Sequence, residues 1–431
     1  MYDGEYSRNG KKIPVDDEPI SRSSSREQNS SSRKRGMSFV DVLQFLICLI
    51  LIISVVIMYS RISNIQNERA IYNMDITSES SNIALAGAKG MLSTVNVGAR
   101  LSNSSASMRT SSDFFNNNYS LGSGVIYSID KSQGTAYIIT NYHVVANASS
   151  SLYKNGYGVY TILPWDSDVP IQATLIGGSH TYDIAVLKVT NSEVIKNSSC
   201  VQAEIASSTE IVLCEPCVAI GNSMGKNLRV TSGVISVEEM VFSKAYETYV
   251  TYLSHNADIN SGNSGGGLYN EVGKLIGIVN AKFADVDDSG TLYYGEVVHG
   301  MFYAIPSSIA VAVAQNIIRN DGSLLMPNIG LVYGKNYTWE SKSMGVDENG
   351  LRTQYSLVLT TSSNGLLAGD KLLSVSYSFA GANISTQLDH ISSIESHIFN
   401  WKVGTEVTFK VLRAGIEKTV KITVEDTTAL T

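Results

Sequence analysis

Short apolar or alternating runs recur along most of the chain and predict a β-rich protein. From about Ile83 onward these runs are separated by Gly, Asn, Asp and Ser, and they include GVIYSI, AYIITN, IAVLKV, CVAIGN, KLIGIV and MFYAIP. Many short strands at close spacing are typical of an antiparallel barrel or sandwich. The segment SSIAVAVAQNIIRN instead predicts a closing helix, with Ser307 or Ser308 as its N-cap.

A second β-rich unit follows from about Pro327. It contains NIGLV, SLVLTT and GLLAGDKLLSV, followed by an amphipathic segment that predicts a helix near Thr386 to Asn400. Alternation on both sides of Ala414-Gly415 predicts a final hairpin. We therefore divide this part of the chain into units at 83-320 and 325-428.

One segment near the start is too apolar for this pattern. The run FVDVLQFLICLILIISVVIMY at 39–59 is long enough to cross a bilayer core of roughly 30 Å as a helix. A cleaved signal peptide is the alternative, but the run is long for that role and no A-x-A-like site follows Met58. We expect a transmembrane helix over 37-60. Because three basic residues precede it at 33–35, we expect a cytoplasmic N-terminus and the rest of the chain outside.

Composition places limits on the remaining segments and on the function. Residues 1-36 are polar, Ser-rich and of mixed charge, which predicts a disordered cytoplasmic tail, and residues 61-82 predict a polar, partly helical stalk. The 431 residues, 43% of them hydrophobic, allow two or three domains with real cores. The net charge of −7 argues against a nucleic-acid binder, which would have a basic surface.

The four cysteines add little. Cys48 lies in the predicted span, and Cys200, Cys214 and Cys217 would lie outside, where disulfides persist. The C-x-x-C spacing at Cys214 leads into a strand-like segment, whereas a redox motif would open a helix. With no second Cys/His pair nearby, we predict no metal site and no cofactor. Packing roles or one structural disulfide remain open.

Three short segments carry candidate catalytic residues. Within IITNYHVV, His143 ends an apolar strand. Asp183 begins a second strand, as the residue before IAVLKV, and Ser264 lies in the Gly-rich stretch NSGNSGGG. A serine nucleophile needs a base within hydrogen-bond reach, and the base needs a carboxylate that fixes its tautomer and stabilises the imidazolium. Each segment alone has an ordinary interpretation as a turn or a strand end. Their combination on an all-β background predicts a catalytic triad.

The glycines around Ser264 predict a site for a developing negative charge. Glycine lets consecutive backbone N–H groups point into one small space. We predict an oxyanion hole over Gly262, Asn263 and Ser264, with the amides of Gly262 and Ser264 as the donors.

The order of motifs carries a family resemblance. TNYHVV, YDIAVLKV, AIGNSMG, TSGVIS, DINSGNSGGGL, LIGIVN and FYAIPS occur as they do in the HtrA (DegP/DegS-like) family of trypsin-fold serine proteases, which the chain resembles from about Ile83 to its end. The second unit resembles the family's PDZ domain. The resemblance implies a mainly β chymotrypsin/trypsin-like double β-barrel followed by a PDZ domain, after one N-terminal transmembrane helix. It implies His143 as general base, Asp183 as its orienter and Ser264 as nucleophile.

The resemblance also implies a function. It implies a membrane-anchored serine endopeptidase in a bacterial cell envelope that cleaves unfolded or signal-bearing polypeptides without ATP, commonly as a homotrimer. A loop over about 101–120 would be regulatory, and one over about 283–299 would shape the S1 pocket and respond to the PDZ domain. In that domain we expect the terminal carboxylate of a peptide to be bound by the amides of Ile329, Gly330, Leu331 and Val332.

The stretch before Ser264 departs from the family's pattern. The family usually has TDA where this chain has HNA from His255, and proline at the positions of Ser261 and Gly267. Each missing proline loosens the unfolded loop by about 0.4–1 kcal/mol, which suggests the hypothesis of a loop that rests in an inactive conformation until a signal orders it. Asp258 lies six residues before Ser264, and we expect it to face solvent rather than to select basic P1 residues.

Two other functions fit parts of the pattern. A peptide-binding sensor or chaperone would keep the protease fold without turnover, and the altered loop before Ser264 is the feature that favours it. An esterase would use the same triad, but the chain lacks a G-x-S-x-G elbow on an alternating β/α pattern. Because all three catalytic residue types are present, we favour the endopeptidase.

Overall fold

The computed structural model describes most of the chain from residue 79 onward. The described ranges are 53–55, 79–101, 109–117, 120–146, 158–207, 211–244, 248–280, 300–332, 336–347 and 350–430. The predicted tail, most of the predicted span, the stalk up to 78 and the predicted loop at 283–299 lie outside them. Among the residues that the structure describes, no helix is both long and apolar enough to span a bilayer.

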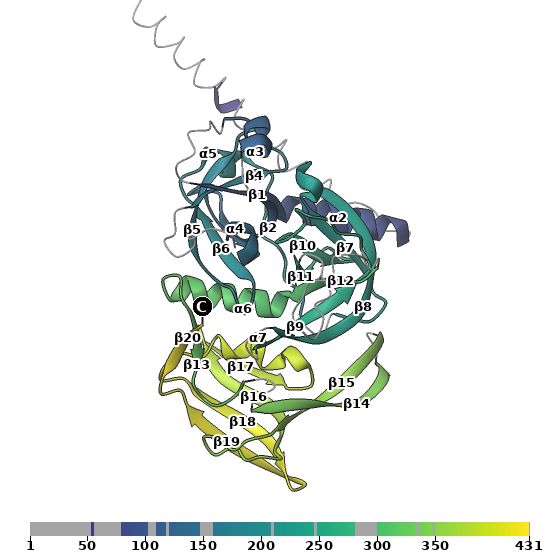
Figure 1. The fold of residues 1–431 in the computed structure, drawn as a ribbon, viewed down its shortest axis with the longest axis vertical. Helices are drawn as coiled ribbons and strands as arrows, with labels where there is room; N and C mark the ends of the chain where they lie inside the picture. The colour runs from purple at the N-terminus through teal and green to yellow at the C-terminus, as the bar shows by residue number, and fades with distance from the viewer. Residues whose placement is uncertain are drawn as a thin grey trace, which may run out of the picture. The chain divides into compact units, whose positions relative to one another are not determined.

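Two closed antiparallel barrels make up the first unit (Figure 1). The first barrel consists of β1 (Thr94–Leu101), β2 (Ser120–Asp130), β3 (Thr135–Thr140), β4 (Gly158–Pro164), β5 (Ile171–Ser179) and β6 (Ile184–Val189). The second consists of β7 (Pro216–Gly221), β8 (Arg229–Lys244), β9 (Thr248–His255), β10 (Gly267–Asn270), β11 (Leu275–Asn280) and β12 (Phe302–Pro306). The strand orders are β1-β2-β3-β6-β5-β4 and β10-β11-β12-β9-β8-β7. The prediction of a mainly β double barrel is therefore confirmed.

Side-chain alternation explains which faces these strands bury. β5 alternates buried and exposed residues in its first half, as a strand with one solvated face does. β6 is buried at almost every position, because one face lines the barrel and α6 (Ser307–Arg319) covers the other. Alternation therefore marks a strand with one face exposed to solvent, as in the first half of β5. A continuous apolar run marks a strand that is buried on both faces, as in β6.

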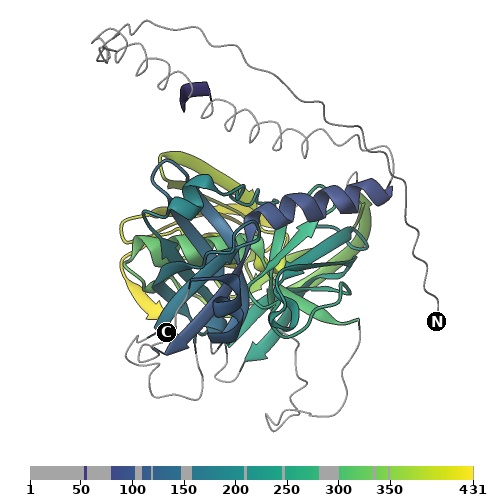
Figure 2. The same ribbon diagram turned by 90° about the horizontal axis from the view of Figure 1, so that it is seen from above.

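Short helices join and cover the barrels. α2 (Glu79–Ser93) lies along β7 and β10 (Figure 2). The others in the first unit are α3 (Ser111–Asn117), inside the predicted regulatory loop, α4 (Tyr142–Val145), α5 (Glu193–Asn197) and the single turn η3 (Ser223–Gly225). The N-cap of α6 is Pro306, not Ser307 or Ser308 as predicted from the sequence. The chain enters α6 directly from β12, so the last strand residue takes the cap position.

The C-terminal unit is a second β structure. β13 (Leu324–Pro327) pairs with β20 (Thr427–Leu430), and a sheet is formed by β14 (Tyr337–Asp347), β15 (Gly350–Leu359), β16 (Lys371–Phe379), β17 (Ala382–Gln387), β18 (Glu406–Arg413) and β19 (Ile416–Thr423). The predicted hairpin at Ala414-Gly415 is confirmed, since both residues have positive φ and Arg413 pairs with Ile416.

The predicted helix over Thr386–Asn400 is wrong in its first part. A turn at Ala380-Gly381, where both residues have positive φ, sends the chain back along β16, so β17 continues to Gln387. Only η4 (Ile391–Ser393) and α7 (Glu395–Ile398) are helical. The Ala-Gly turn is a hairpin signal that amphipathic spacing overrode in the sequence interpretation.

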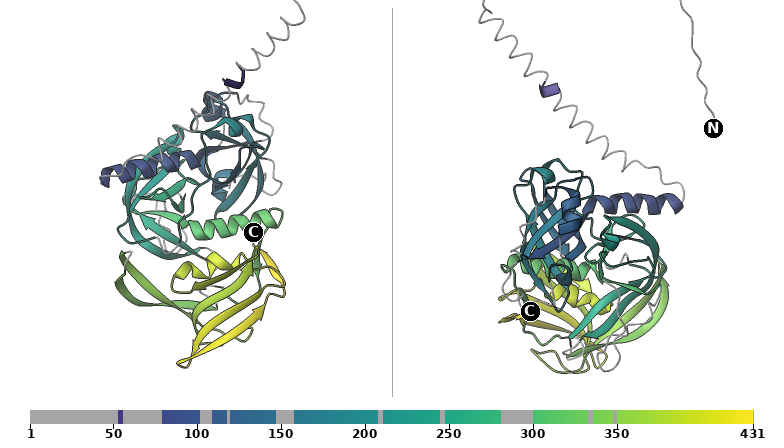
Figure 3. Two further views of the ribbon diagram at one scale, coloured as in Figure 1. Left: turned by 180° about the vertical axis from the view of Figure 1, so that it is seen from behind. Right: turned by 45° about the horizontal axis from the view of Figure 1, so that its top comes forward.

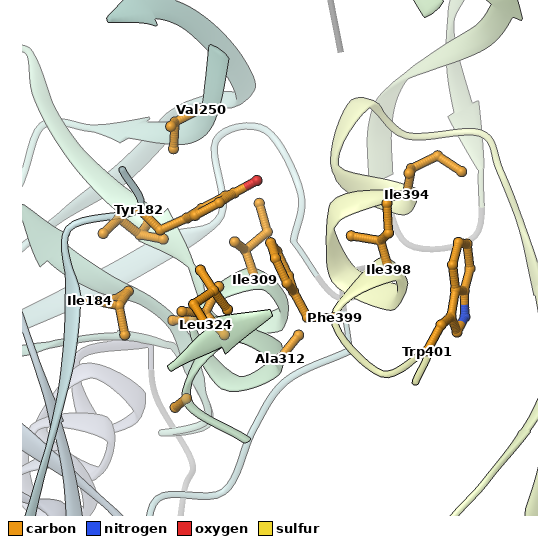
Figure 4. Packing of buried hydrophobic residues seen from close by; sticks show 14 of the residues in the cluster. Tyr182, Ile184, Val250, Ile309, Ala312, Leu324, Ile394, Ile398, Phe399 and Trp401 are labelled. Carbon is orange, nitrogen blue, oxygen red and sulfur yellow. The ribbon is translucent and has the colours of Figure 1, made fainter. Parts of the chain in front are cut away.

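A buried apolar layer joins α6 and α7 to the barrels (Figure 4). Phe399 is fully buried, and its ring meets that of Tyr182 edge-on, with the ring centroids 5.1 Å apart. The carbonyl oxygen of Phe399 accepts hydrogen bonds from Asn316 Nδ2 at 2.7 Å and from the Arg319 guanidinium at 2.6 Å. In the left view of Figure 3, α6 lies between the barrels and the C-terminal strands. The helix is therefore shared by both units.

Two carboxylates, that of the buried Glu395 and that of the half-buried Glu239, lie in the same contact region. Glu395 of α7 accepts hydrogen bonds from Thr251 Oγ1 at 2.7 Å and from the Tyr182 hydroxyl at 3.4 Å. Glu239 of β8 accepts from the backbone amides of Ile391, at 2.6 Å, and Ser392, at 3.1 Å. Burial raises the pKa of both groups, that of Glu395 to about 7. Each carboxylate therefore ties one unit to the other.

We expect the Glu395 contact to weaken as the pH rises. The folded-state pKa of about 7 lies above the usual value of 4.5, so the folded chain holds a proton that the unfolded chain has lost within this window. Stability therefore falls as the pH rises from about 4.5 to about 7, by about 3 kcal/mol. Thermal unfolding of the wild type and of Glu395→Gln at pH 5 and pH 8 measures this: the wild type will lose stability relative to the variant at pH 8.

A matched control is the exposed Glu406, which pairs with Lys421 at 2.8 Å. Glu406→Gln will follow the wild-type pH profile. Parallel profiles for the wild type and Glu395→Gln would contradict the prediction.

Candidate active site

His143 and Asp183 form a hydrogen-bonded pair. His143 Nδ1 lies 2.7 Å from Asp183 Oδ2, and the backbone N–H of His143 donates to Asp183 Oδ1 at 2.9 Å. A carboxylate only accepts, so the proton of the neutral ring lies on Nδ1, and Nε2 is left as an acceptor. The Asp183 side chain is 12% exposed and that of His143 45%. The carboxylate is thus sheltered, whereas the ring is open to a substrate.

Local backbone geometry brings these two side chains together. α4 follows β3 after one residue, and Asp183 occupies a left-handed turn with φ 51° immediately before β6, a conformation that aspartate tolerates better than most residues. The carbonyl oxygen of Asp183 accepts from Tyr142 N–H at 3.1 Å and from Asn141 Nδ2 at 2.9 Å. Because β3 and β6 are paired neighbours, the two turns meet at the same end of the first barrel.

Ser264 lies in a tight turn beside these residues. Ser264 is 4% exposed, and its carbonyl oxygen accepts a hydrogen bond from the N–H of Ser123 in β2 at 2.9 Å. The next residue, Gly265, has φ 84°, and a Cβ there would lie 2.4 Å from Thr140 Oγ1 and 3.0 Å from the Asn141 amide nitrogen. Only glycine fits this position, where the Ser264 turn packs on the end of β3, three residues before His143.

The three amides of the predicted oxyanion hole differ in their partners. Asn263 N–H donates to Asn260 O at 3.0 Å, so it closes the turn. Within the described ranges, the N–H groups of Gly262 and Ser264 have no acceptor. Ser261 O accepts from Met224 N–H at 2.7 Å, and in a planar trans peptide this directs the Gly262 N–H to the opposite side. The prediction that the amides of 262 and 264 are the donors stays open to test.

Other predicted positions fall outside this cluster. Asp258 is exposed, and its carbonyl oxygen accepts from Thr231 Oγ1 at 2.7 Å. His255 is fully buried beside Phe302, and burial lowers its pKa to about 4, so it is neutral at physiological pH. The residue that replaces the family's usual threonine is therefore part of the core of the second barrel.

The described cysteines are free thiols, so the disulfide considered from the sequence is not formed. Cys200 and Cys217 are fully buried, and burial raises the pKa of each to about 12. Both act as packing residues, which is the other interpretation left open above. Cys214 is exposed.

The predicted peptide-binding loop of the C-terminal unit is also described. Ile329 and Leu331 are buried, Gly330 has φ 75° and Val332 is 38% exposed. The Val332 amide donates to Asn336 Oδ1 at 3.3 Å. Of the four amides predicted to bind a carboxylate, that of Val332 therefore already has a partner within the chain.

Three residues near Ser264 were not singled out from the sequence. Ser123, Asn222 and Met224 all bond to the backbone of the Ser264 loop or to one another. The motif AIGNSMG, which contains two of them, was quoted only for its resemblance. In this structure the motif contacts the Ser264 loop: Met224 N–H donates to Ser261 O, and Asn222 N–H donates to the Ser123 hydroxyl that bonds Gly262 O.

Comparison with known proteins agrees with this geometry. A family model described as a trypsin-like peptidase domain matches residues 122–278, a range that contains His143, Asp183 and Ser264. The chain is 29% identical over 318 residues to the serine protease Do-like HtrA of Lactobacillus helveticus, covering 71% of this chain and 69% of the relative.

Two further relatives have similar names. A serine protease Do-like HtrA of Bacillus subtilis is 31% identical over 317 residues, covering 70% of this chain and 62% of the relative. A probable periplasmic serine endoprotease DegP-like of Halomonas elongata is 30% identical over 313 residues, covering 71% of this chain and 56% of the relative. The double barrel, the paired His143 and Asp183 and these relatives lead to one conclusion. The chain is a serine endopeptidase with a trypsin-like peptidase domain, and it is similar to serine proteases named HtrA.

Proposed function

We propose that Ser264 is the nucleophile of this endopeptidase, His143 its general base and Asp183 the residue that orients the base. The observation that carries the proposal is the His143–Asp183 pair, in which the carboxylate accepts from both the ring and the backbone of the same histidine, at 2.7 and 2.9 Å. Two hydrogen bonds fix the position of the ring more closely than one would. Nε2 is then free to take the proton of Ser264.

The chemistry proposed for these groups is acyl transfer. Ser264 Oγ attacks the carbonyl carbon of a peptide bond while His143 Nε2 takes the hydroxyl proton. The negative charge on the former carbonyl oxygen is met by the N–H groups of Gly262 and Ser264, which is where preorganised donors lower the barrier most. His143 then gives its proton to the leaving amine, and water hydrolyses the acyl-enzyme by the same route in reverse.

We propose polypeptides that are unfolded or carry a signal sequence as the substrates, and an extracytoplasmic location in the cell envelope. Support for the substrates comes from the serine proteases among the relatives, and support for the location from a relative named as periplasmic.

The apolar run at 39–59 supports anchoring by one membrane helix with a cytoplasmic N-terminus. Carbonate extraction of membranes tests the anchor: release of the full chain would contradict it. We also propose that the chain forms a homotrimer. The molar mass of the detergent-solubilised protein tests this assembly.

We propose that the C-terminal unit is a PDZ domain that regulates the protease by binding C-terminal peptides. The left-handed Gly330 supports this, because alternating backbone conformations let successive amides converge on a carboxylate. The remaining donors would be the amides of Ile329, Gly330 and Leu331, with that of Val332 freed from Asn336. Titration with peptides ending in Val or Ile, against the same peptides with amidated ends, measures this binding. Equal affinities would contradict it.

The nucleophile is tested by labelling the full chain with a fluorophosphonate, which reacts only with an activated serine. We expect one adduct, located by mass spectrometry on Ser264, together with cleavage of casein. Labelling without cleavage would indicate a formed but gated site, as the hypothesis of an inactive resting loop requires. If a folded chain shows no labelling and no cleavage, the proposal is overturned. That result would favour a peptide-binding protein that keeps the protease fold without turnover.

A further inference from the structure

Ser123 of β2 lies directly under the loop that carries Ser264, and every polar group of this residue is bonded. It is fully buried. Its hydroxyl donates to Gly262 O at 2.8 Å and accepts from Asn222 N–H at 2.7 Å. Its backbone N–H donates to Ser264 O at 2.9 Å, and its carbonyl oxygen accepts from Thr140 Oγ1 at 2.6 Å. One side chain therefore links the nucleophile loop to the turn that begins at Asn222.

The surroundings of the hydroxyl are backbone on both sides. A Cβ on Gly221 would lie 2.8 Å from Ser123 Oγ and 2.8 Å from Asn263 Cα, and a Cβ on Gly262 would lie 2.1 Å from Asn222 O. β2, the Asn222 turn and the Ser264 loop thus approach one another as closely as main chains can. The Ser123 hydroxyl lies between them and bonds to the backbone on both sides.

The bonded carbonyl is the one that bears on catalysis. Gly262 O belongs to the peptide unit that lies between the two free amides, those of Gly262 and Ser264. Gly262 has φ 96° and no Cβ, so nothing in its own structure resists rotation of this unit. Rotation would turn one or both amides away from a shared point. The N–H of this unit, that of Asn263, is held by Asn260 O at 3.0 Å, and the hydrogen bond from Ser123 holds its carbonyl oxygen, so the two bonds together oppose that rotation.

We propose that Ser123 is a positioning residue whose hydroxyl holds the Gly262–Asn263 peptide so that the amides of Gly262 and Ser264 converge on the reacting carbonyl oxygen. The inference rests on the proposed role of Ser264. Ser123 does not touch the substrate; it acts through the loop. Its effect therefore falls on the transition state, where charge develops on the oxygen, and not on ground-state binding.

The test is Ser123→Ala in the full chain, with kcat and KM measured on a peptide substrate. Removal of one oxyanion donor costs about 10²–10³-fold in kcat in other proteases. Ser123 positions the oxyanion donors but is not itself a donor to the oxyanion. We therefore expect kcat of Ser123→Ala to fall about 10- to 100-fold while KM changes less than about threefold. The rate of fluorophosphonate labelling of Ser264 will fall in parallel, since the phosphonate also forms a tetrahedral adduct.

The matched control is Ser93→Ala. Ser93 is also buried, at 2% exposure, and its hydroxyl also makes two hydrogen bonds, to Gly90 O at 3.2 Å and to the Tyr269 hydroxyl at 2.8 Å. It will lower the unfolding temperature as Ser123→Ala does and leave kcat unchanged. If Ser123→Ala does not fold, Ser123→Cys replaces it: the weaker S–H donor will lower kcat without raising KM.

Three results would overturn the inference: a kcat of Ser123→Ala within twofold of the wild type, a higher KM at unchanged kcat, or an equal loss of kcat in Ser93→Ala. These are distinct from failure of the proposed function. In that case the wild type itself gives no adduct on Ser264. A labelled, active wild type with an equally active Ser123→Ala rejects the positioning role alone.

Discussion

Replacing Ser264 by Ala will lower kcat/KM for peptide substrates by about 10⁶-fold, the scale seen when the nucleophile of an unrelated serine protease is removed. The hydroxyl is the only group of the proposed triad that forms a bond to substrate carbon, so no partial function remains to the other two. The free amides of Gly262 and Ser264 persist in the variant, and a residual acceleration of about 10³–10⁴-fold over water is expected from them and from substrate binding.

The matched control for this change is Ser307→Ala at the start of α6. Ser307 is 1% exposed, and among the described residues its hydroxyl has no hydrogen-bond partner, so its loss leaves nothing unpaired. Both variants will keep the wild-type unfolding temperature within a few degrees, and Ser307→Ala will keep full activity. More than about 1% of wild-type activity in carefully purified Ser264→Ala would point to a different nucleophile.

Asp183→Asn will lower kcat by about 10⁴-fold, as the corresponding change does in a well-characterised protease of this mechanism. The two hydrogen bonds explain the size of the effect. The carboxylate accepts from the ring Nδ1–H and from the backbone N–H of His143, whereas an amide has one acceptor only. In one orientation the amide NH₂ faces the ring and moves its proton to Nε2. In the other it faces the backbone N–H, and two donors collide.

The control is Asp130→Asn. Asp130 also accepts hydrogen bonds from two backbone amides, those of Ser132 at 2.9 Å and Gln133 at 3.2 Å, but it is the last residue of β2 before the turn into β3. Its variant will retain kcat within about twofold. A loss of less than tenfold in Asp183→Asn would mean that the charge and the acceptor pattern of Asp183 are not needed to hold His143.

The strands and the candidate triad could be predicted from the sequence because their signals are local, whereas the closure of the strands into two barrels was implied only by the family resemblance. Alternating runs bounded by Gly and Asn gave the strands, and the order of three short motifs gave His143, Asp183 and Ser264. β17 was missed because the turn at Ala380-Gly381 was outweighed by helical spacing downstream. There the tertiary pairing with β16 decided the conformation.

Ser123 could not be predicted, and the reason is distance along the chain. Its hydroxyl partners lie 99 and 139 residues away, and both are backbone groups, which leave no mark on residue type. Glu239 and Glu395 are similar: an isolated glutamate predicts an exposed position, whereas here the amides of the C-terminal unit and Thr251 of the barrel provide partners. Sequence patterns predict which side chains are available, and only the fold determines what each one meets.

Closure of the barrels has a consequence for how the chain reaches its folded state. Each barrel is closed by pairs between strands distant in sequence, such as Val95 with Pro164 and Asn270 with Cys217. Chains dominated by such contacts fold slowly, because much loop entropy is lost before the pairs form. In the described barrels every strand has two neighbours once closure is complete. The described barrels of a folded copy therefore offer no unpaired strand edge to another chain, whereas an unfolded chain offers its whole backbone.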